Sequence, residues 1–189
     1  MKPDLKFNNK ENEIIHTKDG RTLWNSRSVA VSTVLIIVVN GVEYILLIKR
    51  GSGVPDFVGY WANVTGYLDW NENATEAIYR EMYEEAGLDV KSLIESGKIL
   101  FGSFEHPAHV ETNPNSKRQN VSLRYKLVLE LDSLPEVFVD EPECSDGGFF
   151  NFDEIERKIS SGEMQLAFNH AEVISMLHFE WNFRKIKMK

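Results

Sequence analysis

One helix with well-marked ends is the feature of this chain that most constrains its fold. Asn73, followed three residues later by Glu76, forms an N-terminal capping pair, and Gly87 stands where a left-handed C-terminal stop is expected. These signals predict a helix over Ala74–Ala86, about three and a half turns long. A helix of this kind buries its less polar side against other elements of the fold.

Three carboxylates share the side of this predicted helix that should face inward. At about 100° per residue, Glu81, Glu84 and Glu85 fall within the same arc of about 120° as Ala77 and Ile78. A glutamate-rich helix is ordinarily a solvated one, but here the acids point in the direction of the apolar residues. The opposite side is predicted to carry Thr75, Tyr79, Tyr83 and Ala86.

Carboxylates at this spacing need positive charge among them. Partly buried acids at i, i+3 and i+4 repel one another and raise each other's pKa. Arg80 can neutralise one of them by ion pairing. A hard divalent cation can hold the other two, since Mg²⁺ prefers one or two carboxylates together with substrate phosphate. The pattern therefore predicts a divalent-cation site.

The segment from Gly66 to Leu88 resembles the Nudix box, G-x5-E-x7-R-E-U-x-E-E-x-G-U, in which U is a bulky aliphatic residue. The chain differs from many family members in reading Val64-Thr65-Gly66 where they read P-G-G. The flanking pattern also suits the family over residues 27–180. Every defined position of the box is filled, by Gly66, Glu72, Arg80, Glu81, Met82, Glu84, Glu85, Gly87 and Leu88.

This resemblance to Nudix hydrolases implies a hydrolase that depends on Mg²⁺ or Mn²⁺. Its substrate would be a diphosphate that links a nucleoside to another moiety. By position in the box, Glu81, Glu84 and Glu85 are expected to bind or activate the metal, and Arg80 to orient a box glutamate by ion pairing. Gly66 is expected to allow a tight loop before the helix, and Glu72 to brace the loop–helix–loop.

Catalysis needs a further carboxylate from outside the box, because one helix cannot surround a reacting diphosphate. The segment Glu141–Gly148 is acid-rich, and we interpret it as a loop that Gly147-Gly148 allows to bend towards the ligand. Glu143 and Asp146 in this loop are the preferred candidates for the base or extra ligand. Further candidates are Glu105 and Glu111.

Three residues near the predicted site are candidates for binding substrate. Arg50 ends a predicted strand, where it could reach a phosphate, and Tyr67 and Trp70 lie in the box loop, where they could stack on a base. Trp61 is expected to fill the core. Lys117 and Arg118 are expected to be mobile surface bases that could steer phosphate. His106, His109 and His170 lack metal-like spacing and are expected to be polar loop or helix residues.

The order of the other elements predicts an α/β fold, in which a mixed β-sheet is sandwiched between helices. Asn40-Gly41 is a type I′ turn signal, which predicts a hairpin between the strands on either side of it. The resemblance implies the same α/β/α sandwich with a loop–helix–loop catalytic box. Strands are expected at Val29–Val39, Val42–Lys49, Tyr60–Val64, Lys98–Phe104, Val121–Leu131 and Phe149–Phe152, helices at Asp153–Ser160 (capped by Asp153) and Leu166–Phe183, and a long loop at Glu105–Asn120.

The length of 189 residues is that of one domain with a sizeable core. Residues 1–26 are expected to form an N-terminal arm or a hairpin around Asp19-Gly20, and residues 27–189 the Nudix hydrolase domain. No apolar run approaches the ~20 residues that cross a membrane, and the polar N-terminus is not that of a signal peptide. The single cysteine, Cys144, fits a reducing compartment, and we expect a cytoplasmic protein.

The formal charge of −8 argues against general nucleic-acid binding. The expected partner is a small nucleoside diphosphate derivative. It is negatively charged like the protein, and bound metal ions would bridge the two. A homodimer is also expected. Two alternatives are weighed against the hydrolase. A non-catalytic Nudix-like nucleotide sensor usually loses box glutamates, which this chain keeps. An isoprenoid diphosphate isomerase of the same superfamily needs an active-site cysteine, and Cys144 stands alone and outside the expected context.

Overall fold

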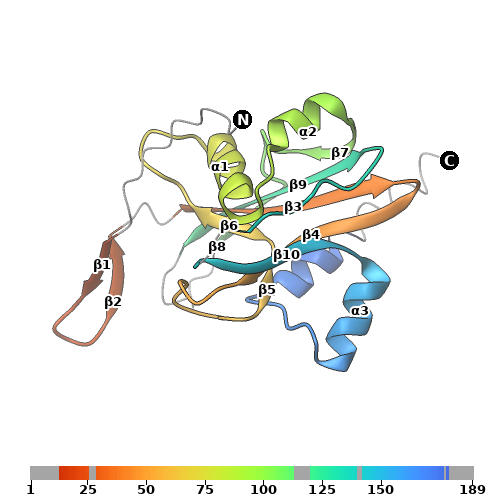
Figure 1. Cartoon of the computed structure of the whole chain (residues 1–189). Coiled ribbons are helices and arrows are strands. Elements are labelled where there is room, and N and C mark those ends of the chain that lie inside the picture. The colour runs from red at the N-terminus through yellow and green to blue at the C-terminus, as the bar shows by residue number, and fades with distance from the viewer. Residues whose placement is uncertain (1–12, 26–28, 113–119, 140–141, 177, 179–189) are drawn as a thin grey trace.

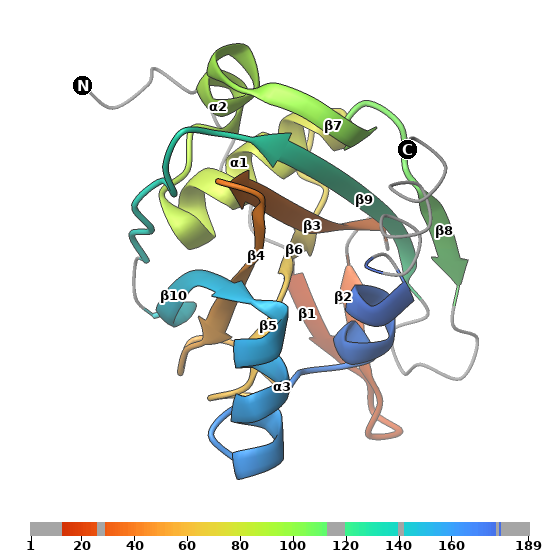
Figure 2. The ribbon, with the colours of Figure 1, turned by 90° about the vertical axis from the view of Figure 1, so that its right-hand side faces the viewer.

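A mixed sheet between two layers of helices forms the body of the molecule (Figures 1 and 2). The computed structural model describes residues 13–25, 29–112, 120–139, 142–176 and 178. The sheet contains β3 (Val29–Val39), β4 (Val42–Arg50), β5 (Trp61–Ala62), β6 (Val64–Tyr67), β7 (Lys98–Ser103), β8 (His109–Thr112), β9 (Val121–Glu130) and β10 (Cys144–Asn151). The helices are α1 (Ala74–Ala86), α2 (Val90–Ser96) and α3 (Phe152–Ser161), followed by a helical stretch at 170–176.

The strand order along the sheet is β10-β4-β3-β9-β7. β3 and β9 run parallel, whereas the other pairs in the sheet are antiparallel. The expected hairpin between β3 and β4 is present. Asn40 and Gly41 both have positive φ, 51° and 79°, as a type I′ turn requires. The predicted α/β fold with a mixed sheet is confirmed.

Two hydrophobic layers lie on the two faces of the sheet. Val31, Leu35 and Ile37 of β3 pack into the layer that includes Ile78 and Met82 of α1. The alternate residues of β3, Val34, Ile36 and Val38, pack into a second layer with Ile155 of α3 and with Val173 and Ile174 of the C-terminal helical stretch. β3 is therefore buried on both faces, which explains its almost continuous run of apolar residues. In Figure 1, α1 and α2 lie above the sheet and α3 below it.

The ends of α1 are those expected from the sequence. Asn73 accepts a hydrogen bond from the Glu76 backbone N–H at 3.0 Å, and the Glu76 carboxylate accepts one from the Asn73 N–H at 2.7 Å. Gly87 closes the helix with a φ of 68°. Each box residue on α1 is thus held at a fixed position between two strong helix boundaries.

The prediction that Ala86 lies on an outward side of α1 was wrong, because Ala86 is fully buried. α2, which was not predicted from the sequence, begins at an Asp89 cap and packs against α1. In addition, the backbone N–H of Phe138 donates to the Ala86 carbonyl at 3.0 Å. α1 is therefore covered on two sides, by the sheet and by α2 with the segment before β10.

The predicted bending loop at Glu141–Gly148 was also wrong over most of its length. β10 already begins at Cys144, and Gly147 and Gly148 pair with Ile48 and Leu47 of β4. Backbone pairing with β4 overrides the low strand propensity of the two glycines. A Cβ on Gly147 would lie 2.9 Å from a Val139 methyl group, so this glycine serves close packing rather than bending.

Three smaller boundaries differ from expectation. β8 lies within the segment predicted as a long loop, because it pairs with β9. Asn151, not Asp153, caps α3, and its side chain accepts from the Glu154 N–H at 2.8 Å. Leu166 forms a bridge with Trp61 instead of starting the last helix, which is described at 170–176. Lys117 and Arg118 lie outside the described residues.

The N-terminal region contains a hairpin of β1 (Glu13–His16) and β2 (Thr22–Asn25), which form a sheet of their own. Figure 1 shows this hairpin standing apart from the main sheet. Residues 1–12 lie outside the described part, so the division into an arm of residues 1–26 and a domain of 27–189 stays a prediction. In the part of the chain that the structure describes, no helix is long and apolar enough to cross a membrane.

Candidate active site

Arg80 is the centre of a charged network between α1 and the loop before it. Its Nε and Nη2 donate to the two carboxylate oxygens of Glu72 at 3.0 and 2.8 Å. Its Nη1 donates to Glu81 at 2.6 Å and to Glu84 at 2.9 Å, and Nη2 also donates to the Tyr67 carbonyl. Burial by itself would lower the pKa of the Arg80 guanidinium. The hydrogen bonds to Glu72 and the charges of the neighbouring acids outweigh this effect, so the pKa is raised.

Glu72 joins the loop to the helix. Its Oε1 accepts from the Asp69 backbone N–H as well as from Arg80. One carboxylate thereby fixes both the entry of the loop and the orientation of the arginine. This is the bracing geometry that the family resemblance implied for Glu72.

The three carboxylates at the end of α1 differ in environment. Glu81 and Glu85 are buried, with 8% and 7% of their surface exposed, whereas the Glu84 side chain is 44% exposed. Burial raises the pKa of the Glu81 carboxyl to about 7, although the charge of Arg80 opposes this. Burial and the charge of Glu81 also raise the pKa of Glu85. Two buried acids therefore repel each other beside a more exposed third.

The strand β6 shapes the space around these acids. The backbone N–H of Thr65 donates to the Glu85 carboxylate at 3.1 Å. A Cβ on Gly66 would overlap the Glu81 carboxylate, so glycine is required here for close approach rather than for a tight loop. No feature of the sequence pointed to the Thr65 contact, because it depends on how α1 packs across β6.

The candidate residues before and in β10 have different surroundings. The negative charge of Glu143 contributes to the raised pKa of both Glu81 and Glu85, and its backbone carbonyl accepts from the Gly51 N–H at 2.6 Å, next to Arg50. Asp146 is an exposed residue opposite Lys49, and its side chain accepts from the Gly147 N–H at 2.8 Å. Of the two candidates, Glu143 is the one whose charge acts on the box.

Arg50 is buried at the end of β4 and is paired with Asp56. Its Nη2 lies 2.7 Å from an Asp56 carboxylate oxygen, and its Nε donates to the Asp56 carbonyl at 3.1 Å. The charge of Arg50 also opposes the rise in the pKa of Glu85. Arg50 thus lies close enough to act on the site electrostatically while its guanidinium is engaged by Asp56.

The other sequence candidates are distributed around this site. The Tyr67 hydroxyl accepts from the Asn120 amide at 2.6 Å, and Trp70 is 51% exposed on the box loop. Trp61 is buried, as expected for a core residue. Glu111 forms an ion pair with Arg124, so its carboxylate is engaged away from the box, and the charge of Glu105 acts on Tyr79.

His170, expected as a polar loop or helix residue, begins the helical stretch at 170–176 and is buried in the protein interior. Its Nδ1 accepts the backbone N–H of Asn63 at 3.0 Å. Burial and the charges of Arg124 and Arg50 lower the pKa of His170 to about 3, so the ring is neutral at neutral pH. The sequence contained no signal for this contact, since 107 residues separate the two partners.

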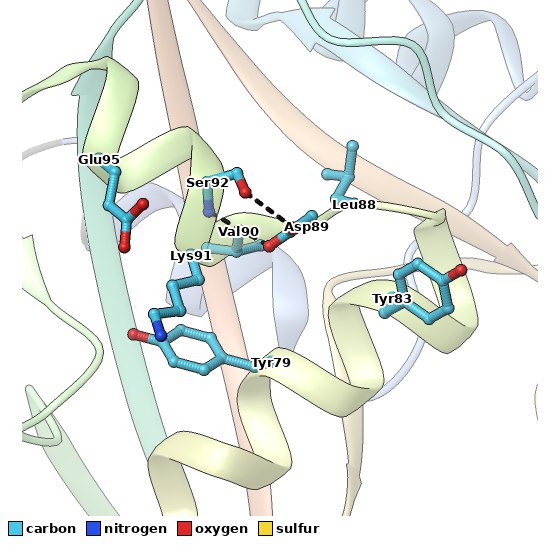
Figure 3. Close-up of a pocket in the computed structure, with 8 residues that line it drawn as sticks. All are labelled: Tyr79, Tyr83, Leu88, Asp89, Val90, Lys91, Ser92 and Glu95. Carbon is cyan, nitrogen blue, oxygen red and sulfur yellow. Dashed lines mark hydrogen bonds between the residues drawn. The ribbon is translucent and has the colours of Figure 1, made fainter. Parts of the chain in front are cut away.

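A pocket on the other side of α1 does not coincide with this site. It has a volume of about 320 Å³ and lies between α1 and α2, where Figure 3 shows Tyr79 and Tyr83 on α1, with Tyr79 beside Lys91 of α2. Its lining contains none of the predicted site residues. We regard the charged cluster, rather than this pocket, as the candidate active site.

The chemistry of the cluster suits a hard divalent cation. Two buried, mutually repelling carboxylates and an exposed third provide oxygen donors of the kind that Mg²⁺ and Mn²⁺ prefer. Within the described residues, no three acidic, histidine or cysteine side chains already converge as a metal cage. Arg80 Nη1 instead contacts both Glu81 and Glu84, at 2.6 and 2.9 Å. A cation would compete with the guanidinium for these oxygens.

Comparison with known proteins identifies the family. The NUDIX domain model matches residues 29–174, most of the chain. The chain belongs to the NUDIX family. This match confirms the expectation, drawn from the box residues, that the chain is a Nudix hydrolase. No curated protein sequence gave a significant match to the chain.

Solved Nudix structures have a similar fold. The NUDIX domain of Shewanella oneidensis NrtR, complexed with ADP ribose, has a TM-score of 0.56 and 16% identity, with 80% of this chain and 86% of that chain covered. An Ap4A hydrolase from C. elegans has a TM-score of 0.55 and 18% identity, with 82% and 98% covered.

A third similar structure is a bifunctional NMN adenylyltransferase/ADP ribose pyrophosphatase from Francisella tularensis, complexed with AMP and a Mn ion. Its TM-score is 0.57 and its identity 22%; 81% of this chain is covered but only 41% of that chain. At these identities, the three similarities establish the fold alone.

Proposed function

We propose that the protein is a divalent-metal-dependent hydrolase that cleaves a diphosphate linkage between a nucleoside and another moiety. The observation that carries this proposal is the pair of buried, mutually repelling carboxylates of Glu81 and Glu85 beside Gly66. Burial of two like charges is costly for a fold unless a cation joins them. A NUDIX family member that retains both acids is best explained as a metal-using enzyme.

Glu81, Glu84 and Glu85 are the residues proposed to hold Mg²⁺ or Mn²⁺. When bound, such a cation polarises phosphoryl oxygens and lowers the pKa of an attacking water. Arg80 acts as a positioning residue, since its contacts with Glu72 fix the direction in which it holds Glu81 and Glu84. Thr65 keeps one Glu85 oxygen directed towards β6.

Glu143 is proposed to accept the proton of the attacking water. It approaches the box from the chain segment before β10, so it lies on a different element from the three helix acids. Asp146 remains the second candidate for this role. Arg50 is proposed to stabilise phosphate charge from the end of β4, and Tyr67 and Trp70 to contact the substrate from the box loop.

The class of substrate is proposed from the family and its relatives. Similar structures contain ADP ribose or AMP, and the AMP complex also contains a Mn ion. A small nucleoside diphosphate derivative is therefore the proposed partner, and the acidic net charge of −8 disfavours nucleic acid. A cytoplasmic location and a homodimer are retained as proposals, to be tested by fractionation and sedimentation.

The deciding experiment is a substrate panel assayed with Mg²⁺, with Mn²⁺ and with excess chelator. Nucleotide sugars, dinucleoside polyphosphates, ADP-ribose, NADH and oxidised nucleotides form the panel. We expect metal-dependent cleavage of at least one diphosphate and its loss in Glu85→Gln. Tight nucleotide binding without cleavage of any of these compounds would support the alternative of a non-catalytic sensor.

A further inference from the structure

Residues 168–170, a turn that leads into the helical stretch at 170–176, contact two residues from distant segments of the chain. Asn169 Oδ1 accepts a hydrogen bond from Arg124 Nη2 at 2.9 Å. His170 Nδ1 accepts the backbone N–H of Asn63 at 3.0 Å. Asn63 follows Trp61 by two residues, so its side chain lies on the same sheet face, the one that α3 covers. This face is opposite to that covered by α1.

The polar atoms beneath the turn are not all satisfied. Asn63 is fully buried, and in the described part of the chain both its amide oxygen and its amide nitrogen lack a hydrogen-bond partner. The same holds for Nε and Nη1 of Arg124, although its Nη2 pairs with Glu111 and Asn169. Buried polar atoms without partners are costly, so each calls for an explanation. The three nitrogen atoms carry five N–H bonds between them, against a single acceptor oxygen, that of the Asn63 amide.

Two exposed aromatic side chains border this polar cluster. Phe57 and Phe168 are 40% and 45% exposed, and their ring centroids lie 4.6 Å apart. Both residues have a φ of 52°, a left-handed conformation that side chains larger than Asn rarely adopt. Backbone strain of this kind persists where the surrounding structure enforces it, often at ligand sites. The strain here holds two phenyl rings at the surface.

Arg50 connects these rings to the box acids. Its guanidinium lies 5.1 Å from the centroid of the Phe168 ring. Its positive charge lowers the pKa of both Glu85 and His170. A ligand whose phosphates reach the box would therefore bring a group attached to them near Phe57 and Phe168.

We propose that the aromatic pair of Phe57 and Phe168, with the unpartnered atoms of Asn63 and Arg124, binds the nucleobase of the substrate, and that this base carries carbonyl oxygens. The proposal rests on the proposed function. Stacking on exposed aromatic rings binds any base. The surplus of N–H donors selects guanine or uracil over adenine, because Arg pairs with carbonyl-bearing edges such as that of guanine. Since these atoms are buried, the base reaches them as the 168–170 turn shifts.

Equilibrium binding to the full chain tests the proposal without turnover. GMP, UMP, AMP and ribose 5-phosphate are titrated by calorimetry in the presence of Mg²⁺. We expect GMP or UMP to bind at least about tenfold more tightly than ribose 5-phosphate and more tightly than AMP. Phe168→Ala should weaken GMP binding about tenfold and leave ribose 5-phosphate unchanged. Phe138→Ala, which removes another exposed phenyl ring, is the matched control and should change neither affinity.

Asn63→Ala separates recognition from a structural role. If the amide serves the ligand, its removal keeps the melting temperature and abolishes the preference for GMP over AMP. If a buried water satisfies the amide instead, the melting temperature falls and the preference survives, which overturns the proposal. Equal affinities for GMP, AMP and ribose 5-phosphate also overturn it.

The two proposals fail in different ways. Base-dependent binding in a protein that cleaves no diphosphate would support the proposed base site and contradict the proposed hydrolase activity. Metal-dependent cleavage without any base-dependent affinity would support the proposed hydrolase activity and contradict the proposed base site.

Discussion

The Arg80 guanidinium and the Glu72 carboxylate are joined by two parallel hydrogen bonds, Nε to Oε2 at 3.0 Å and Nη2 to Oε1 at 2.8 Å. A two-point contact of this kind fixes the plane and the direction of the arginine. The remaining nitrogen, Nη1, is thereby aimed at Glu81 and Glu84. The loop before α1 thus sets the position of the acids on α1, although these acids are separated from Glu72 by at least two helical turns.

Glu85→Gln and Glu84→Gln are each expected to lower kcat by about 10²-fold or more, within the range measured for lost electrostatic stabilisers. The Glu85 variant should fold at least as well as the natural protein, because it removes a buried charge that Glu81 repels. Steady-state kinetics and thermal melts provide the measurement. Glu95→Gln, at an exposed position on α2, is the control. Near-normal turnover in both box variants would contradict the assignment of Glu84 and Glu85 as metal ligands.

Arg80→Ala is expected to reduce both activity and stability. It leaves Glu81 with a buried charge that has lost its ion-pair partner, and Glu72 with a partly buried one, at a cost of about 3–5 kcal/mol in the free energy of unfolding. Denaturant titration measures this cost. Arg157→Ala removes an exposed arginine that lies 3.9 Å from Glu163, and it should change stability by less than about 1 kcal/mol. Equal effects of the two substitutions would show that Arg80 is only a surface residue in energetic terms.

Glu143→Gln and Asp146→Asn are expected to behave differently. Of the two residues, Glu143 is the one whose charge raises the pKa of the box acids, so Glu143→Gln should lower kcat by about 10²-fold and alter the pH–rate profile. Asp146→Asn is the matched control, since its carboxylate contacts the neighbouring Gly147 N–H. Full activity and an unchanged profile in both variants would place the base elsewhere, with Glu105 as the next candidate.

Gly66→Ala is expected to damage the site more than the fold. The added Cβ would overlap the Glu81 carboxylate and push it out of place, so activity should fall at least tenfold. Gly148→Ala is a suitable control in another strand, because its Cβ would meet the Phe150 ring at an ordinary 3.5 Å. Turnover and melting temperature are compared for both. A fully active Gly66→Ala variant would show that Glu81 has room to move.

His170 is expected to make the protein sensitive to acid. Burial lowers its folded-state pKa to about 3 from the ordinary 6.5, so the folded state binds fewer protons than the unfolded state between these values. The stability that this neutral histidine contributes is present above pH 6.5 and is lost as the pH falls towards 3, on the order of 5 kcal/mol in all. Stability curves against pH should flatten in His170→Asn, in which the amide can accept the Asn63 N–H. They should keep their slope in His16→Asn, at an exposed histidine of β1.

The sequence determined the parts of this protein that depend on local chemistry. The bounds of α1 followed from Asn73, Glu76 and Gly87, because caps act within a single turn of chain. The turn between β3 and β4 followed from Asn40-Gly41 for the same reason. The spacing of the box acids was sufficient to identify the family, since one helix brings them together.

Only the tertiary structure decided which long-range neighbours each residue has. Gly147-Gly148 lie in a strand because β4 offers them a backbone to pair with, and Ala86 is buried because it packs into the core layer that also contains Leu88 and Val90. The close approach of the Glu81 carboxylate to Gly66 and the burial of His170 against Asn63 both join segments that are separated in the chain. Pairing and packing of such segments leave no local pattern to read, because their energy comes from surfaces that meet only in the folded protein.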